Sequence, residues 1–174
     1  HAPSGQLWRS LYGNGIRTEY AFDRRLRPVA LNVRDTRDGD RALLSYAYRY
    51  DNGANITQIA DERPVTSAFP AGDSRRNNQR FAYDDLYQLT SVDYSFAAPG
   101  ATPTNDGDIN YVFNPIGNLR AKTSTINHQD SEGRSITNLG AMTYGAAPPV
   151  IAGPHALTAT ASGRNFAYDA NGNT

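Results

Sequence analysis

The 174-residue chain contains no cysteine, which excludes disulfides, zinc–thiolate sites and thiol catalysis together. The lack of cysteine does not decide whether the protein is intracellular or secreted, because a large secreted β-protein can also fold without cysteine. Basic and acidic residues each total 17, so the formal net charge is zero. A nucleic-acid partner usually requires a basic surplus. The basic pair Arg75-Arg76 is too short for such a surface, and we predict that it lies in a solvated loop.

Chemistry-bearing motifs are scarce as well. His1, His128 and His155 have no metal-ligand spacing, and Ser162 lacks the frame of a nucleophile elbow. We therefore expect no catalytic residue, no metal and no cofactor, and we predict that the chain is not an enzyme. No apolar run approaches the ~20 residues of a membrane-spanning helix, and no signal peptide opens the chain. Because His1 is not an initiator residue, we expect a piece of a longer protein.

Two carboxylate groupings invite a functional interpretation. Asp84 and Asp85 are adjacent, but neighbouring strand residues point to opposite faces, which argues against a catalytic pair. The stretch "NDGDIN" at 105–110 has some features of a calcium loop, yet the twelve-residue spacing with its terminal Glu is missing. We favour a hairpin turn there, with calcium binding as the alternative.

What the sequence does contain is a repeated aromatic–x–aromatic–Asp pattern. The Asp or Asn positions of five copies are 28, 33, 30 and 55 residues apart, so a degenerate copy is expected inside the last gap. "MTYGAAPPVIAGPHALTAT" fits there, with Tyr144 as the aromatic and Leu157-Thr158 as the exit. The five clear copies are Tyr20, Phe22 and Asp23; Tyr48, Tyr50 and Asp51; Phe81, Tyr83 and Asp84; Tyr111, Phe113 and Asn114; and Phe166, Tyr168 and Asp169.

The spacing predicts a strand, a tight turn and a second strand in each copy. Residues i and i+2 share one face of a strand, so each pair places two rings on that face. Asp or Asn then favours a turn, and a glycine shortly afterwards, such as Gly117 or Gly172, permits a positive φ. Extended patterns resume at Ile56, Leu89 and Leu119. Hairpin turns are therefore predicted at 23–27, 51–55, 84–88, 114–118 and 169–173.

Taken together, the pattern predicts an all-β chain of antiparallel hairpins with about a dozen strands, too many for one flat sheet without curling. We expect a single array over residues 1–174, with five clear units and one degenerate unit. Further turn signals lie at 13–15, 38–40 and 106–108, and surface loops are predicted at 62–78, 97–108 and 145–154. The aromatic pairs could stack sugars or bases, but their regularity favours a packed cross-strand ladder.

The segments "FAYDDLYQLTSV", "YRYDNGANITQI", "FNPIGNLRAKT" and "FAYDANGNT" resemble the YD repeats of RHS (rearrangement hot spot) proteins. "GPHALTAT…FAYDANGNT" also resembles the stretch that precedes the C-terminal core of these proteins. The resemblance covers roughly residues 10–174. The chain departs from the pattern where Asn114 replaces Asp, where Leu26, Ala54 and Tyr87 replace the turn glycine, and where Pro28 replaces the apolar exit residue.

The resemblance implies a segment of a curved, spiralling sheet that forms the wall of a hollow shell. In bacterial toxin-complex and secretion-system members the shell encloses a toxic C-terminal segment, so we expect a non-catalytic, secreted or cell-surface segment that encapsulates or presents a toxin or effector. The alternative is an extracellular adhesion or glycan-contact module. The expected partners are neighbouring repeats, other copies of the chain through edge strands, and an enclosed toxin polypeptide, with no nucleic acid and no membrane span. A single lysine, Lys122, among 17 basic residues fits a GC-rich bacterial genome.

Overall fold

The computed structural model describes residues 5–126, 128–145 and 153–169, and these residues form strands, turns and loops without any helix. It follows that no described segment is a helix long and apolar enough to cross a bilayer. The strands are β1 (Arg9–Leu11), β2 (Ile16–Phe22), β3 (Pro28–Asp35), β4 (Arg41–Tyr50), β5 (Ile56–Asp61), β6 (Asn78–Tyr83), β7 (Leu89–Ser95), β8 (Gly107–Phe113), β9 (Leu119–Ser124), β10 (Gly140–Tyr144) and β11 (Leu157–Thr160).

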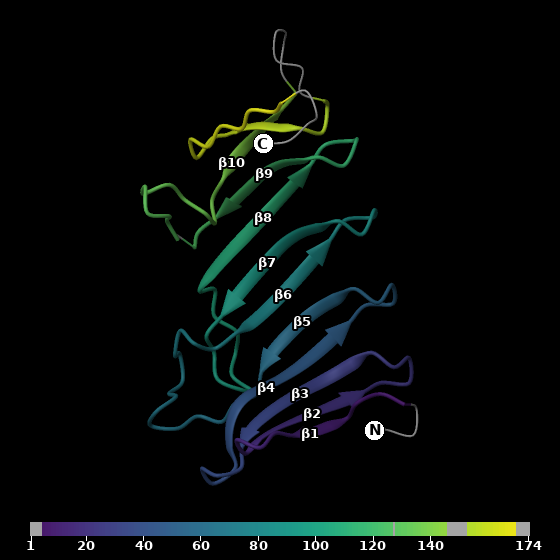
Figure 1. The fold of residues 1–174 in the computed structure, drawn as a ribbon, viewed down its shortest axis with the longest axis vertical. Helices are drawn as coiled ribbons and strands as arrows, with labels where there is room; N and C mark the ends of the chain where they lie inside the picture. The colour runs from purple at the N-terminus through teal and green to yellow at the C-terminus, as the bar shows by residue number, and fades with distance from the viewer. Residues whose placement is uncertain (1–4, 127, 146–152, 170–174) are drawn as a thin grey trace. The chain divides into compact units, whose positions relative to one another are not determined.

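Strand order in the sheet is the same as strand order in the sequence, from β1 to β11 (Figure 1). Each strand is therefore bonded to the one before it, and the pairs whose registers are resolved are antiparallel. Sequential antiparallel pairing needs only hairpins, because a short turn can join two such strands. The predicted all-β meander is confirmed, with eleven strands in the described part of the chain where about a dozen were expected.

The contacts divide the chain into two compact units. Unit 1 contains residues 1–81 and 93–106, and unit 2 contains residues 82–92 and 107–174. The boundary passes through β6 and β7, so each unit contains part of that hairpin.

Unit 1 is a sheet whose two faces carry different kinds of side chain. On one face, register pairing aligns Tyr20 with Leu31, Leu31 with Tyr46, and Tyr46 with Asp61. One residue along, four alanines on β2, β3, β4 and β5 are aligned in the same way. These are Ala21, Ala30, Ala47 and Ala60. Since successive strand residues alternate faces, one face of unit 1 carries the large rings and the other carries a row of small side chains.

Fully buried apolar side chains are few. Among the described residues, the buried hydrophobic ones are Val92 and Ile109, both in unit 2. The fully buried side chains of unit 1 are polar, and they include Asp61, Arg76 and Ser95. Most aromatic residues are half-buried, so the apolar contribution to stability is spread over cross-strand pairs rather than concentrated in one core.

The connections between hairpins correct one prediction. Turns occupy 13–15 and 36–40 as the glycine signals indicate. The turn predicted at 106–108 is wrong, because Gly107 is the first residue of β8 and the connection from β7 spans 96–106. Asp106 fixes the end of that loop instead: its carboxylate accepts a hydrogen bond from the Phe96 amide at 2.6 Å and another from the Thr104 hydroxyl.

Candidate functional site

The second aromatic residue of each repeat ends a strand. β2 ends at Phe22, β4 at Tyr50, β6 at Tyr83 and β8 at Phe113, so the Asp or Asn of the motif is the first residue beyond the strand. The next strand then begins five residues after that position in all four repeats, at Pro28, Ile56, Leu89 and Leu119. Four of the five predicted hairpins thus lie where the motif places them. Most of the fifth, at 169–173 with Gly172, lies outside the described residues.

The motif side chain closes each turn through the backbone. One Oδ1 atom accepts hydrogen bonds from the amides two and four residues ahead, at 2.8 and 3.0 Å for Asp23 and at 2.9 Å for both amides of the Asp84 turn. Asn114 does the same with its amide oxygen, at 3.1 and 2.9 Å. A neutral oxygen is therefore sufficient for the turn, which explains why Asn can stand at this position.

Two of the motif aspartates, Asp23 and Asp51, have a lowered pKa. For Asp23, the hydrogen bond from the Arg27 amide lowers the pKa most, and the Arg27 side chain adds to the effect with its Nε at 2.7 Å from Oδ2. For Asp51, the largest cause is the hydrogen bond from the Asn55 side chain. Hydrogen bonds to a carboxylate favour its ionised form.

The third residue after the motif Asp or Asn has left-handed backbone geometry in every described repeat. Its φ is 62° at Leu26, 71° at Ala54, 60° at Tyr87 and 84° at Gly117. Only Gly117 adopts this conformation without a steric cost, because a Cβ atom clashes with the backbone in the left-handed region. The three positions where the sequence departs from the repeat pattern are therefore strained turns of unchanged shape.

Two further turns of the same kind were not predicted. Asp130 accepts from the amides of Glu132 and Arg134 at 3.0 and 2.9 Å, and Gly133 has a φ of 74°. At 160–164 the hydroxyl of Thr160 replaces the carboxylate and accepts from the Arg164 amide at 3.2 Å. The aromatic pair is absent before both turns, but the glycine three residues after the Asp or Thr was a usable signal in "DSEGR" and "TASGR".

Tyrosine hydroxyls join one hairpin to the hairpin before it. The Tyr50 hydroxyl donates to the carbonyl of Pro28 at 2.7 Å, and the Tyr144 hydroxyl donates to Leu119 at 2.8 Å. The Tyr168 hydroxyl donates to Leu157, again at 2.8 Å. In each case the acceptor is the first residue of the strand that follows the preceding turn. The bond fixes the position of one repeat relative to its neighbour.

Aromatic packing supplements these bonds in unit 1. The rings of Tyr20 and Phe22 stack with centroids 6.2 Å apart, and the Arg27 guanidinium lies over the Tyr50 ring at 4.3 Å. Burial is the main cause that raises the pKa of Tyr48, and the neighbouring tyrosines add to it. The remaining motif residues on strands, Phe81 on β6 and Tyr111 on β8, occupy the same position two residues before the strand end. Phe166 and Asp169 follow the bridge between Ala159 and Asn165.

A buried ion pair fastens the long loop 62–77 of unit 1. The Asp61 carboxylate is fully buried and accepts from the Arg63 side chain, with Nη2 at 2.5 Å, and from the amides of Arg63 and Asn77 at 3.1 Å each. Burial by itself raises the pKa of Asp61, but the hydrogen bonds from Arg63 and Asn77 outweigh it, and the pKa is lowered. Asp61 therefore stays ionised and holds both ends of the loop.

The prediction that Arg75-Arg76 lies in a solvated loop is wrong for Arg76, which is 2% exposed. Its guanidinium donates to the carbonyl of Arg63 at 3.0 Å and lies 4.3 Å from the centroid of the Phe69 ring. Arg63 and Arg75 also lie against that ring, at 4.0 and 5.3 Å. The ring and the backbone carbonyls compensate the buried charge, so this basic pair is part of the structure of the loop.

No cluster of three metal-ligating side chains occurs in the part of the chain that the structure describes. His155 bonds Asn118 through Nδ1 at 2.5 Å, and the Asn118 amide donates to the Pro154 carbonyl at 2.7 Å, so this histidine fixes the "GPHAL" segment onto the 114–118 turn. His128 lies in the 125–139 connection, and His1 lies outside the described residues.

Comparison with known proteins gives a fold but no family. Neither a family model nor a curated protein matches the chain. Among solved structures, a segment of the Photorhabdus luminescens Tc holotoxin pore matches with a TM-score of 0.59 at 22% identity. The crystal structures of TcdB2-TccC3-TEV and TcdB2-TccC3-Cdc42 match with TM-scores of 0.60 and 0.57 at 23% and 21% identity.

These matches cover 82%, 82% and 83% of this chain, and the chain spans 7% of the length of each Tc toxin chain. The chain therefore shares the antiparallel, sequential-hairpin fold of a short segment of Tc toxin proteins.

Proposed function

We propose that the chain is a non-catalytic wall segment of an RHS/YD-repeat shell that encloses or presents a C-terminal toxin or effector. The observation that carries the proposal is the repeated coupling between hairpins. Each Asp or Asn turn is closed by its own side chain, and tyrosine hydroxyls bond back to the start of the preceding returning strand. Such a unit can be added to a sheet many times without a deep apolar core, which is what a thin wall requires.

The likeness to segments of Tc toxin chains supports this proposal at the level of fold. We propose that residues 1–174 form a single repeat array within a longer bacterial protein that is secreted or displayed at the cell surface. Its partners are then the neighbouring repeats, or other copies of the chain through edge strands, and an enclosed polypeptide. The fifteen residues of the five clear copies, together with Gly117 and Gly172, have a structural role in this proposal. They determine the turns and the strand register.

The test is protease protection of the protein at its natural length. We expect the region that follows the repeats to resist digestion in the intact protein and to be cleaved at least tenfold faster when it is produced alone. Electron microscopy of the same sample should show this segment in the wall around that region. Equal digestion rates in the two samples would overturn the proposal.

The alternative, an extracellular adhesion module, is favoured by exposed side chains at two hairpin tips of unit 2. Leu86, Tyr87 and Ile116 are 74%, 66% and 58% exposed, although they are large and apolar. Exposed apolar groups of this kind are typical of contact surfaces. A cell-binding assay with the Leu86→Ser and Ile116→Ser double variant distinguishes the two functions, because only the adhesion function predicts that binding is lost while protection is kept.

A further inference from the structure

Unit 1 contains a hollow on the face of its sheet that carries the alanine row. The cavity has a volume of about 780 Å³ and lies between β4, β5, β6, β7 and the loop 97–105. This volume falls in the range of ligand-binding pockets. Ala47 and Ala60 of the alanine row line the cavity, so the hollow exists because two neighbouring strands place methyl groups where longer side chains would fill the space.

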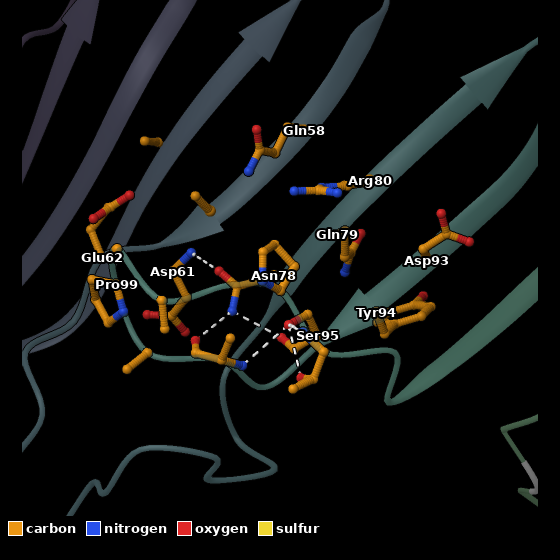
Figure 2. Close-up of a pocket in the computed structure, with 18 of the residues that line it drawn as sticks. Gln58, Asp61, Glu62, Asn78, Gln79, Arg80, Asp93, Tyr94, Ser95 and Pro99 are labelled. Carbon is orange, nitrogen blue, oxygen red and sulfur yellow. Dashed lines mark hydrogen bonds between the residues drawn. The ribbon is translucent and has the colours of Figure 1, made fainter.

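Long polar side chains stand beside the alanine row. Register pairing aligns Arg49 with Gln58 and Gln58 with Arg80, so three hydrogen-bonding side chains lie on one face of three neighbouring strands. Adjacent strands are about 4.8 Å apart, which sets the spacing of these groups. In Figure 2, Glu62 and Pro99 lie at the left of the pocket, and Asp93 and Tyr94 lie at the right. Gln58 and Arg80 lie between these two pairs.

Several polar side chains that line the pocket are not used by the protein itself. Seven of them have no hydrogen-bond or ion-pair partner among the described residues. They are Arg49, Gln58, Glu62, Arg80, Asp93, Tyr94 and Asn105. Two are cationic and two are anionic, so their charges sum to zero. A strongly charged ligand such as a phosphate or nucleic acid would lie near carboxylates as often as near guanidinium groups.

The wall of the pocket that the loop 97–105 forms is held in place by hydrogen bonds. Asn78 donates from Nδ2 to the carbonyls of Ser95 and Ala97 at 2.9 and 3.0 Å, and its Oδ1 accepts from the Asp61 amide at 2.9 Å. The Ser95 hydroxyl accepts from the Thr104 amide at 3.0 Å. The loop 97–105 is thus anchored at both ends, and a preformed wall lowers the entropic cost of binding a ligand.

We propose that this pocket binds a neutral saccharide. A sugar presents several adjacent hydroxyls, each of which donates and accepts, together with an apolar ring face. The guanidinium groups of Arg49 and Arg80 and the amide of Gln58 match such hydroxyls in pairs, while Glu62 and Asp93 accept from others. The methyl groups of Ala47 and Ala60 provide an apolar surface for the ring face. The saccharide site does not depend on the proposed role as a shell wall, because a wall segment can have a binding pocket on one of its faces.

Saturation-transfer NMR of the 174-residue chain with maltotetraose, cellotetraose and chitotetraose tests the proposal, with titration calorimetry for the sugar that gives the strongest signal. We expect at least one of the three to bind, and Gln58→Ala to weaken it about tenfold. Ala60→Leu should weaken binding, because its longer side chain occupies the part of the hollow beside Gln58. Its matched control is Ala21→Leu, which changes the same alanine row outside the pocket and should leave binding unchanged.

Circular dichroism must show the same fold in all four proteins. No binding of any of the three sugars at 10 mM, or equal binding by the Ala60→Leu and Ala21→Leu variants, would overturn the saccharide site. So would preferential binding of a heparin oligosaccharide, since the pocket then selects anions. None of these results bears on protease protection by the wall, so a failed pocket and a failed wall can be told apart.

Discussion

The Asp61–Arg63 pair offers a test of how much a buried charge contributes to this thin sheet. Replacing Asp61 by Ala removes the acceptor of the Arg63 side chain, the Arg63 amide and the Asn77 amide. The Arg63 side chain is 14% exposed, so its charge is left largely buried without a counterion. Removing one member of a buried pair costs about 3–5 kcal/mol, and we expect a loss in this range.

The chain contains a matched control. Asp38 and Arg41 are also joined by an Asp–Arg contact of 2.5 Å, but their side chains are 63% and 59% exposed. A surface pair contributes about 0–1 kcal/mol, because water solvates both ions when the contact is broken. Asp38→Ala should therefore lose less than about 1 kcal/mol, although the pair has the same residue types and the same separation.

Urea unfolding followed by far-ultraviolet circular dichroism measures both losses, provided that the slope against denaturant is unchanged. The Asp61→Leu/Arg63→Met double variant removes both charges, and it should recover part of the stability, since no unpaired ion remains but the Arg63 and Asn77 amides still lack their acceptor. Equal losses in Asp61→Ala and Asp38→Ala would show that burial does not determine the contribution of the pair, and would refute the reasoning.

Three other outcomes are expected. Tyr87→Gly should raise stability by about 0.5–1 kcal/mol by removing left-handed strain, whereas Gly117→Ala should lower it by about 1 kcal/mol; thermal unfolding measures both. Asp84→Asn should unfold within about 0.5 kcal/mol of the wild type and Asp84→Ala should lose about 1–2 kcal/mol, because an amide oxygen also closes the turn. The pKa is lowered for Asp61, and to about 2 for Asp73, so stability should be constant above the unfolded pKa of about 3.9 and fall as the pH drops below it. Acid titration of the unfolding midpoint checks this, and a midpoint unchanged down to pH 2 would contradict it.

Local sequence patterns were sufficient for the hairpins. The Asp-centred turn needs only residues within five positions of one another, and its shape survives at Leu26, Ala54 and Tyr87 without glycine. In the stretch predicted to be a degenerate copy, Tyr144 ends β10 and pairs with Leu157 at the start of β11. That this stretch is a repeat unit stays a prediction, and most of the segment between the two strands lies outside the described residues.

Long-range contacts could not be predicted in the same way. Arg76 reaches the Arg63 carbonyl across 13 residues of loop without any periodic pattern, so composition alone suggested a solvated pair. The pocket depends on strand register: Ala47 and Ala60 become neighbours only through the pairing of β4 with β5. A shift of one residue would place these side chains on the opposite face, and the sequence gives no direct measure of register for that strand pair.

The two ends of the strands have different roles within each unit. In unit 1 the aspartate turns at 23–27 and 51–55 lie at one end, and antiparallel pairing places the connections 36–40 and 62–77 at the other. The aspartate turn has a fixed length because one side chain must reach two amides, so register is set there. The opposite end is free to accept insertions of any length that can anchor themselves, as loop 62–77 does through Asp61 and loop 96–106 does through Asn78 and Ser95. Loops on a rigid scaffold are where binding functions usually reside. Differences in function between proteins with this fold should therefore be found in these insertions, while the aspartate turns remain constant.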